Sequence, residues 1–591
     1  MVRFGLFVFD PRSGDLRKQG RKIRLEGQPV QILVKLLERP GELVTREELQ
    51  KELWPADIYV NYDHGLNAAV KRLRRALNDS PARPVFIETL SRRGYRFIAP
   101  VIAIGHPNSY THLPPRVTDL AVLPFEDLSG DPSVEYLGEG IAEAVIHALS
   151  QLPAVRVMAR SAAFRFKGAN LDPQAIGRKL NVRAILVGRV WQRGDSLTIG
   201  AELVDVRNGW QIWGGQYNRK LSEIQTVEEE MTREMCDSLR LRLNGEEGGR
   251  VFRHFTENTE AYQEYLKGRF HWNRLSEVSV RRSIECYQNA ISQDPNYALA
   301  FAGLADSYAL LGFFGVERPA NLFPKAKQAA LQALALDERL SEAHCALAGI
   351  LKIYEWDWEG AERAYEQALR LDPKNWQAHR GYAALLAARG RTNAAMREIQ
   401  SAHELDPLSL SLSMEIAWNL YIARRYDDAI RQAARTLEME PQFFPAQHAL
   451  GLAYEETGRY EEARTALEQA ASGSGNPTAT AALARVSALM GDTEAARRLL
   501  AELLALHHLS YVLPYLPALV YAGLAEYEEA LTWLERACDD RDPYLVWIGM
   551  DPRLDRLRDH PRFRNLLERI ERGAAHTGGE NLERGSAASG K

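Results

Sequence analysis

Basic side chains gather at two places within the first hundred residues. Six lysines and arginines form the two groups: Lys71, Arg72, Arg74, Arg75, Arg92 and Arg93. Cations packed this closely repel one another in water unless a polyanion neutralises them, as the phosphates of nucleic acid do. The alternative is a solvated basic face, which is the usual interpretation of an isolated run of charge.

The net charge separates this segment from the rest of the chain. The 591 residues carry a formal net charge of −4, yet residues 1–100 hold 19 Lys and Arg against 12 Asp and Glu. The first hundred residues are therefore strongly basic, and all the remaining residues together are acidic. A basic head on an acidic body indicates an anionic partner for the head alone, with double-stranded DNA the leading candidate.

Three helices and a hairpin are expected to position the basic groups. Hydrophobic spacing predicts a helix over 29–39, and Thr45 with Glu48 forms a capping box that opens a second helix. In a third helix, Leu66, Val70, Leu73 and Leu77 fall on one narrow face. The remaining broad arc of that helix carries His64, Asn67, Ala68, Lys71, Arg72, Arg74 and Arg75, which are polar or basic except for the alanine.

A hairpin is predicted directly after the third helix. Strands over 85–89 and 95–98 flank a basic turn that closes at Gly94. A helix of this kind can read base edges in the major groove, and a basic wing can reach the DNA backbone or the minor groove. Together these two elements are sufficient for DNA binding. The expected DNA-binding residues are His64, Asn67, Ala68, Lys71, Arg72, Arg74, Arg75, Arg92, Arg93 and Tyr95.

Residues 1–99 resemble the OmpR/PhoB-type winged-helix domain along their whole length. The resemblance rests on the N-terminal strands, on Leu53-Trp54, on the helix at 70–77 and on the wing at 88–97. It implies that residues 63–77 enter the major groove, with Arg72 and its neighbours reading bases and Lys71, Arg74 and Arg75 serving mainly phosphates.

The same resemblance implies two further partners. The turn at 56–62 contacts RNA polymerase in relatives, although Trp54 and Tyr59 fit ordinary packing equally well. Relatives also sit head to tail on direct repeats, which implies DNA-driven pairing. We expect no phosphoacceptor domain here, and the CadC/ToxR-like relatives that begin in this way often carry a membrane helix after the wing.

The composition predicts a cytoplasmic protein without a membrane helix or secretion signal. Residues 97–104 are too short to span a bilayer, and no run of about 18 apolar residues occurs elsewhere. The four cysteines are widely spaced and match neither a disulfide framework nor a zinc site. We expect no metal or cofactor.

Residues 117–243 alternate predicted strands and helices. The expected order is a strand at 120–125, a helix at 141–152, a strand at 155–160, a helix at 173–180, a strand at 183–191, two hairpin turns and a helix at 221–243. This region resembles the TolB-like domain of bacterial regulators. The motifs are Ala121-Val122-Leu123-Pro124-Phe125, Leu137-Gly138-Glu139-Gly140-Ile141, Val187-Gly188-Arg189-Val190 and Gln211-Ile212-Trp213.

The central region presents no catalytic constellation. Gly138-Glu139-Gly140 begins like a dinucleotide loop but has Glu143 where the third glycine belongs. Asp127, Asp131 and Glu135 form an acidic cluster that could suit a metal, although a solvated loop is the simpler interpretation. We therefore expect the chain not to be an enzyme.

A 34-residue period dominates residues 257–572. Ala361, Ala395, Ala429 and Ala463 are each 34 apart. This spacing matches tetratricopeptide repeats, which stack helix pairs into a superhelix. We count about eight units with a C-terminal cap, and the concave groove is expected to bind a protein or peptide, or else to serve as a scaffold.

The sequence therefore predicts a multidomain α+β chain. Its parts are an N-terminal winged helix-turn-helix (1–99), a linker (100–116), a central mixed α/β domain (117–243), a hinge (244–256), an all-α tetratricopeptide superhelix (257–572) and a disordered tail (573–591). The leading hypothesis is a sequence-specific transcriptional regulator. The alternatives are an adaptor with a vestigial winged helix and, less favoured, an enzyme hidden in the central domain.

Overall fold

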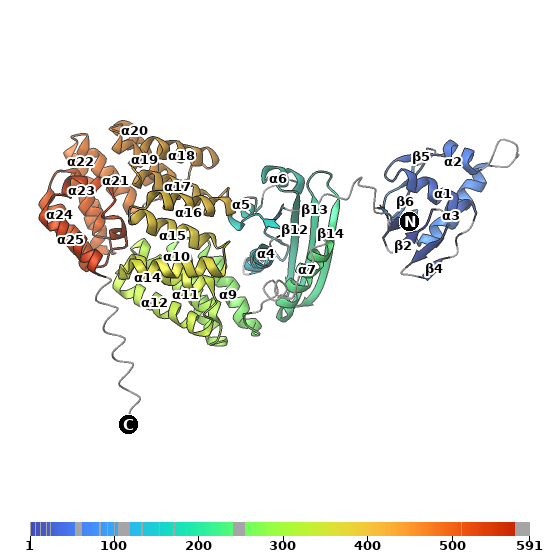
Figure 1. Ribbon diagram of the computed structural model, residues 1–591, viewed down its shortest axis with the longest axis horizontal. Helices are drawn as coiled ribbons and strands as arrows, with labels where there is room; N and C mark the ends of the chain where they lie inside the picture. Colours follow the sequence, from blue (N-terminus) through green and yellow to red (C-terminus); the bar gives the residue numbers. More distant parts are fainter. Residues whose placement is uncertain are drawn as a thin grey trace, which may run out of the picture. The chain divides into compact units, whose positions relative to one another are not determined.

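The computed structural model divides the chain into two compact units, Met1–Pro115 and Arg116–Lys591 (Figure 1). The structure describes residues 2–5, 7–11, 14–18, 21–23, 25, 27–53, 62–81, 84–90, 93–99, 101–103, 119–131, 134–152, 154–168, 172–239, 255–474, 476–509 and 511–573. Most of the predicted linker and hinge and nearly all of the predicted tail lie outside these residues. The described exceptions in the linker and hinge are residues 101–103, where Ile102–Ala103 form a strand, and residues 255 and 256.

The described residues of the first unit form two antiparallel sheets and three helices. One sheet has the strand order β4-β3-β2-β1-β8, and the other has the order β5-β7-β6. The strands are β1 Val2–Phe4, β2 Phe7–Phe9, β3 Leu16–Lys18, β4 Arg21–Ile23, β5 Leu43–Thr45, β6 Ile87–Leu90, β7 Gly94–Phe97 and β8 Ile102–Ala103. The helices are α1 Gln28–Glu38, α2 Arg46–Leu53 and α3 Tyr62–Leu77.

This unit has its own hydrophobic core. Aromatic rings from the first sheet pack edge-on against the wing, with ring centroids 5.1 Å apart for Phe4 and Phe97. The apolar face predicted for the third helix is buried as expected, since Leu66 and Leu73 are both fully covered. The capping box is also confirmed: the Thr45 N–H donates to Glu48 Oε2 at 2.7 Å, and the Glu48 N–H donates to Thr45 Oγ1 at 3.2 Å.

The second unit opens with a mixed six-stranded sheet. Its order is β11-β9-β12-β13-β14, with β10 parallel to β12. The strands are β9 Asp119–Val122, β10 Glu126–Asp127, β11 Arg156–Val157, β12 Ala184–Arg193, β13 Ser196–Asp205 and β14 Gln211–Lys220. The helices are α4 Glu135–Ser150, α5 Arg160–Phe164, α6 Pro173–Lys179 and α7 Ile224–Ser238, the last preceded by the 3₁₀ turn η2 Leu221–Glu223.

Helices cover both faces of this sheet. Residues of α4 and α7 pack on Leu120, Leu186 and the neighbours that share their face. Residues of α5 and α6 pack on the alternate side chains, including Ala121 and Ile185. The strand predicted at 155–160 was too long, because Arg160 instead begins the short helix α5.

The described residues then form eight helix pairs followed by a cap. The paired helices are α9 Thr259–Trp272, α10 Glu277–Gln293, α11 Ala298–Phe314, α12 Pro319–Leu336, α13 Ser341–Ile350, α14 Trp358–Leu371, α15 Trp376–Ala388, α16 Thr392–Leu405, α17 Leu410–Ile422, α18 Tyr426–Met439, α19 Phe444–Glu456, α20 Tyr460–Ser474, α21 Pro477–Leu489, α22 Thr493–Leu509, α23 Tyr515–Gly523 and α24 Tyr527–Asp539. The π-helical turn η3 Leu351–Glu355 extends α13, and the cap comprises the 3₁₀ turns η4 Pro543–Trp547 and η5 Pro552–Leu557 and the helix α25 Pro561–Arg572.

Small residues set the spacing of the paired helices. The repeated alanines at 361, 395, 429 and 463 are all buried. A Cβ on Gly381 would lie 2.5 Å from the Tyr365 hydroxyl, so glycine there lets the tyrosine ring of the preceding helix pack against the backbone. The small residues that recur every 34 positions therefore lie where neighbouring helices pack against each other.

The C-terminal cap lies across the first helices of several repeats. Trp547 of η4 packs edge-on against Trp418 of α17, with ring centroids 5.6 Å apart. The Arg541 guanidinium stacks on Trp356 and donates to the Tyr354 carbonyl at 3.3 Å. The end of the array is therefore joined to a turn near its third helix pair.

A buried ion pair anchors this cap. Arg553 Nη2 lies 2.6 Å from Asp551 Oδ2, and both side chains are almost completely covered. The Tyr515 hydroxyl donates to the same carboxylate at 2.8 Å. The Arg553 guanidinium holds the pKa of Asp551 below its usual range despite burial.

Candidate DNA-binding surface

One face of α3 is polar and exposed. Its inward residues Leu66, Val70, Leu73 and Leu77 fix the helix to the core. Asn67, Ala68, Lys71, Arg72 and Arg75 are all exposed on the opposite arc. The helix ends where Asn78 adopts a left-handed conformation with φ of 56°, which asparagine tolerates.

Arg74 behaves differently from its basic neighbours. Its side chain is only 11% exposed. The guanidinium Nη2 donates to the Ile87 carbonyl at 2.7 Å and to Thr89 Oγ1 at 2.8 Å. Arg74 therefore joins α3 to β6, and this geometry contrasts with the phosphate-contacting role expected for it.

Tyr95 and Asn67 belong to one hydrogen-bonded network. The Tyr95 ring is buried, and its hydroxyl donates to Asn67 Oδ1 at 3.0 Å. Arg46 at the start of α2 donates both to the Tyr95 hydroxyl at 3.2 Å and to Asn67 Oδ1 at 3.1 Å. The network connects α2, α3 and β7, and it fixes the amide of Asn67 at the exposed surface.

The wing is held close to β5 by a glycine. A Cβ on Gly94 would lie 2.1 Å from the Val44 carbonyl oxygen, a distance that excludes any other residue without movement of the backbone. The preceding turn is closed by the Arg93 N–H, which donates to the Leu90 carbonyl at 2.9 Å. Arg93 is exposed at this turn.

Sequence reasoning missed two residues that orient the site. The buried carboxylate of Asp79 accepts the Val85 N–H at 2.7 Å and the Ile87 N–H at 2.9 Å, and so fixes where β6 begins. Arg46 was also absent from the expected set. No spacing pattern marks either residue, because each acts through a strand or helix far along the chain.

Some expected site residues cannot be placed. Arg92, Trp54 and residues 56–61 lie outside the described residues. His64 lies within α3, but its side chain is also outside them.

The acidic and glycine motifs of the central domain have packing roles. Asp127 Oδ1 accepts the Ser129 N–H at 2.8 Å, and Glu135 pairs with Lys167 and Arg274. A Cβ on Gly138 would lie 2.3 Å from the Phe125 carbonyl, so this glycine serves close packing. Within the described ranges, no group of three or more His, Cys, Asp or Glu residues could hold a metal ion.

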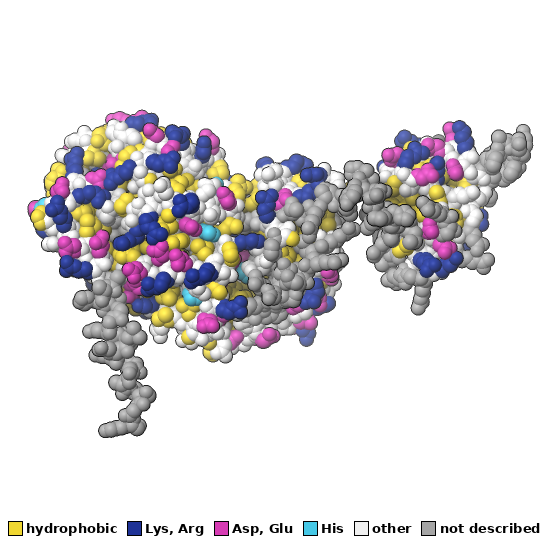
Figure 2. Space-filling model, viewed as in Figure 1, with side chains coloured by type: hydrophobic (Ala, Val, Ile, Leu, Met, Phe, Trp, Pro, Cys, Tyr) yellow, Lys and Arg dark blue, Asp and Glu magenta, His cyan; other side chains and the backbone are white. Residues whose placement is uncertain are grey.

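The array shows a mixed surface, with acidic and basic side chains interspersed on the face seen in Figure 2. The chain's own cap contacts the turns within two helix pairs: Met550 lies against Gly390, and Arg424 binds Asp555. Among the described helices, none combines the length with the hydrophobicity that spanning a bilayer requires.

Three family models, with two descriptions between them, match the chain. "Transcriptional regulatory protein, C terminal" matches residues 20–97, and "Tetratricopeptide repeat" matches residues 353–411 and 414–477. The N-terminal unit is a regulator-type DNA-binding domain of the OmpR/PhoB class, and the C-terminal region is a tetratricopeptide array. These three models do not cover the central domain.

Three relatives illustrate the similarity. Transcriptional regulator HilA of Salmonella typhimurium is 25% identical over 433 residues, covering 72% of this chain and 75% of its own length. Putative adenylate cyclase 3 of Rhizobium meliloti is 33% identical over 226 residues, covering 38% of this chain and 37% of its own length. The cholera toxin homolog transcriptional activator of Vibrio parahaemolyticus is 38% identical over 98 residues, covering 16% of this chain and 34% of its own length.

The matched regions are similar to those of one class of protein, transcriptional regulators that also carry tetratricopeptide repeats. This class accounts for the family matches and for the similarity to HilA over most of each chain. The chain spans little more than a third of the length of the putative adenylate cyclase.

Proposed function

We propose that the chain is a sequence-specific DNA-binding transcriptional regulator. The observation that carries the proposal is the exposed arc of α3, which presents Lys71, Arg72 and Arg75 beside the Arg93 turn of the wing. An α-helix of this kind fits the major groove, where an arginine can bind guanine with two hydrogen bonds. Arg72 is the leading base reader, with Asn67 and Ala68 at its side.

Some of the expected site residues contact DNA phosphates, and others hold the helix and the wing in place. Lys71, Arg75 and Arg93 serve phosphates, together with Arg92. Arg74 and Tyr95 position the wing and the helix relative to each other, because their polar atoms already bind Ile87, Thr89 and Asn67. His64 retains the base-proximal role that its place in the helix predicts.

Selection of binding sites from random DNA with the full chain tests the proposal. Enrichment of one sequence is expected, and Arg72→Ala should cost about 1–3 kcal/mol at that site and relax selectivity at one position. Lys71→Ala is the matched control on the same helix face and should weaken binding to all sequences alike. Selection without any enrichment would favour the adaptor alternative.

Further partners follow from the family resemblance. RNA polymerase would contact residues 56–62, and two copies would pair on direct repeats of the operator. A protein or peptide would bind the inner side of the repeats beside the cap. Chromosomal DNA as the target places the chain in the cytoplasm.

The central domain is proposed to be TolB-like and without catalytic activity. Its glycine motif is engaged in packing against Phe125, and Glu135 is engaged in ion pairs. The similarity to a putative adenylate cyclase makes cyclic nucleotide formation the activity to assay. Cyclic AMP produced from ATP by the purified full chain would contradict this part of the proposal.

A further inference from the structure

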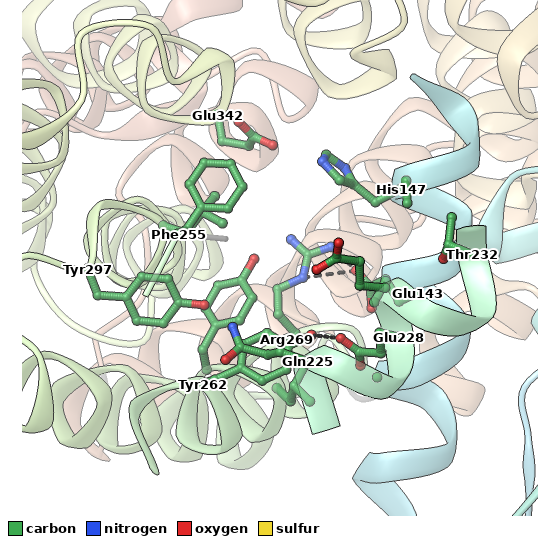
Figure 3. A pocket seen from close by; sticks show the side chains of 17 residues that line it. Glu143, His147, Gln225, Glu228, Thr232, Phe255, Tyr262, Arg269, Tyr297 and Glu342 are labelled. Carbon is green, nitrogen blue, oxygen red and sulfur yellow. Dashed lines mark hydrogen bonds and ion pairs between the residues drawn. The ribbon is translucent and has the colours of Figure 1, made fainter. Parts of the chain in front are cut away.

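A cavity lies where the central domain meets the first repeats. It has a volume of about 180 Å³ and is lined by residues of α4, α7, α9 and the segments around Tyr297 and Glu342 (Figure 3). All of these belong to the second compact unit. Neither the DNA-binding proposal nor the repeat groove accounts for this cavity.

Glu228 of α7 contributes a buried carboxylate to the cavity wall. The side chain is 8% exposed, and its Oε2 accepts the Tyr262 hydroxyl at 2.6 Å. Its other oxygen, Oε1, is buried without a hydrogen-bond partner among the described residues. A buried carboxylate oxygen without a donor is costly, so the position indicates a ligand that supplies one.

Acidic groups outnumber basic ones around the cavity. Four carboxylates line it: Glu143, Glu228, Glu229 and Glu342. Arg269 is the arginine of the lining, and it already binds Glu143, with its Nε 3.0 Å from Oε1. Glu143 also pairs with Arg160, and Glu229 pairs with Arg233. Glu228 and Glu342 are then the lining carboxylates without an ion pair among the described residues, and they disfavour an anionic ligand and favour a cation.

Aromatic rings form another part of the wall. Phe255, Tyr262, Tyr265 and Tyr297 all line the cavity, and Figure 3 shows Phe255 and Tyr297 on the repeat side, across from Glu143 and His147 of α4. The faces of aromatic rings attract organic cations, and they also cover an apolar ligand body. The combination of these rings with the carboxylates of Glu228 and Glu342 fits an ammonium group on an apolar body.

We propose that this cavity binds a small organic ammonium ion, with Glu228 pairing with the ammonium group and the aromatic rings covering its apolar part. Such a ligand would touch α4 and α7 of the central domain and α9 and α13 of the repeats at once. It would therefore stabilise this contact between the two parts. The inference goes beyond DNA binding and does not depend on it.

The pH dependence of binding follows from Glu228. Burial raises the pKa of this carboxyl to about 8. The groups facing it are Tyr262, Tyr265 and Arg269 on α9, Glu143 and His147 on α4, Glu229 on α7, and Tyr297 and Glu342 from the later repeats. A cation binds the ionised form, so below pH 8 binding releases a proton and the affinity falls as the pH falls.

Calorimetry on the full chain tests the proposal with benzylammonium as the probe. Saturable binding is expected, whereas benzyl alcohol and benzoate, which have nearly the same shape, should bind far more weakly. Equal binding of the alcohol would overturn the ammonium assignment. The absence of saturation up to about 10 mM benzylammonium would overturn the site itself.

Glu228→Gln isolates the carboxylate. Glutamine keeps an acceptor for the Tyr262 hydroxyl, so the melting temperature should hold while benzylammonium affinity drops at least ~30-fold. Glu230→Gln on the same helix is the control, because Glu230 pairs with Arg219 and does not line the cavity. If Glu228→Gln fails to fold, Glu342→Gln decides: unchanged affinity in that variant would contradict a site shared with the repeats.

Discussion

Replacing Arg74 by methionine should destabilise the N-terminal unit without removing a DNA phosphate contact. The guanidinium makes two charged hydrogen bonds, of 2.7 and 2.8 Å, to β6, and its side chain is 11% exposed. Losing charged bonds of this kind costs roughly 2–4 kcal/mol in total, because the Ile87 carbonyl loses its donor. Methionine retains most of the apolar stem of the side chain.

The expected size of the effect is large enough to measure in residues 1–115, whose hydrophobic core is internal to that unit. For a domain of this size, each kcal/mol lowers the melting temperature by roughly 4–8 °C, so a fall of roughly 8–32 °C is expected. Thermal unfolding followed by circular dichroism gives this value. DNA affinity is then measured at several salt concentrations, at a temperature where the variant is folded. The slope of log affinity against log salt reports the number of phosphate contacts.

Lys71→Ala is the matched comparison. Lys71 is exposed on the same helix, so its loss should leave the melting temperature within a degree or two. Removing one phosphate contact should reduce the slope of log affinity against log salt by about 0.9, whereas Arg74→Met should leave that slope nearly unchanged. An Arg74→Met variant that melts normally but loses one unit of slope would refute the assignment of Arg74 to structural support.

Three more variants follow from the described contacts. Gly94→Ala should cost roughly 1–3 kcal/mol, because its Cβ would meet the Val44 carbonyl, and urea unfolding of residues 1–115 measures the loss. Thr45→Ala should cost about 1 kcal/mol through loss of the α2 cap, whereas Thr45→Ser should retain it; equal stability of the two would argue against the capping box. Arg553→Met should destabilise the second unit by about 3–5 kcal/mol by leaving Asp551 buried without its partner, and unfolding of the full chain followed by tryptophan fluorescence would detect it. A normal unfolding midpoint would contradict the anchoring role of this pair.

Periodic features were predictable from the sequence because local spacing determines them. The apolar face of α3, from Leu66 to Leu77, follows from helical geometry alone. The same holds for the Thr45–Glu48 cap and for the repeated alanines of the helix pairs. Each of these contacts joins residues that are close along the chain or that recur at a fixed interval.

Contacts between distant segments were not predictable in this way. A helical wheel places Arg74 on the polar arc, but the long arginine side chain reaches Ile87 and Thr89 on a strand that the wheel does not include. Similarly, no repeat pattern indicates that Trp547 returns to Trp418. The cavity around Glu228 was missed for the same reason, since its walls come from elements more than a hundred residues apart.

The return of the C-terminal cap to earlier helices restricts how this array can evolve. In an open repeat protein, a unit can be duplicated or deleted because each repeat contacts only its neighbours. Here Arg541 reaches back to Trp356, so an added pair of helices between them would move one contact surface away from the other. The number of repeats in this interval is therefore fixed by geometry, and natural variants should change loop lengths rather than repeat count.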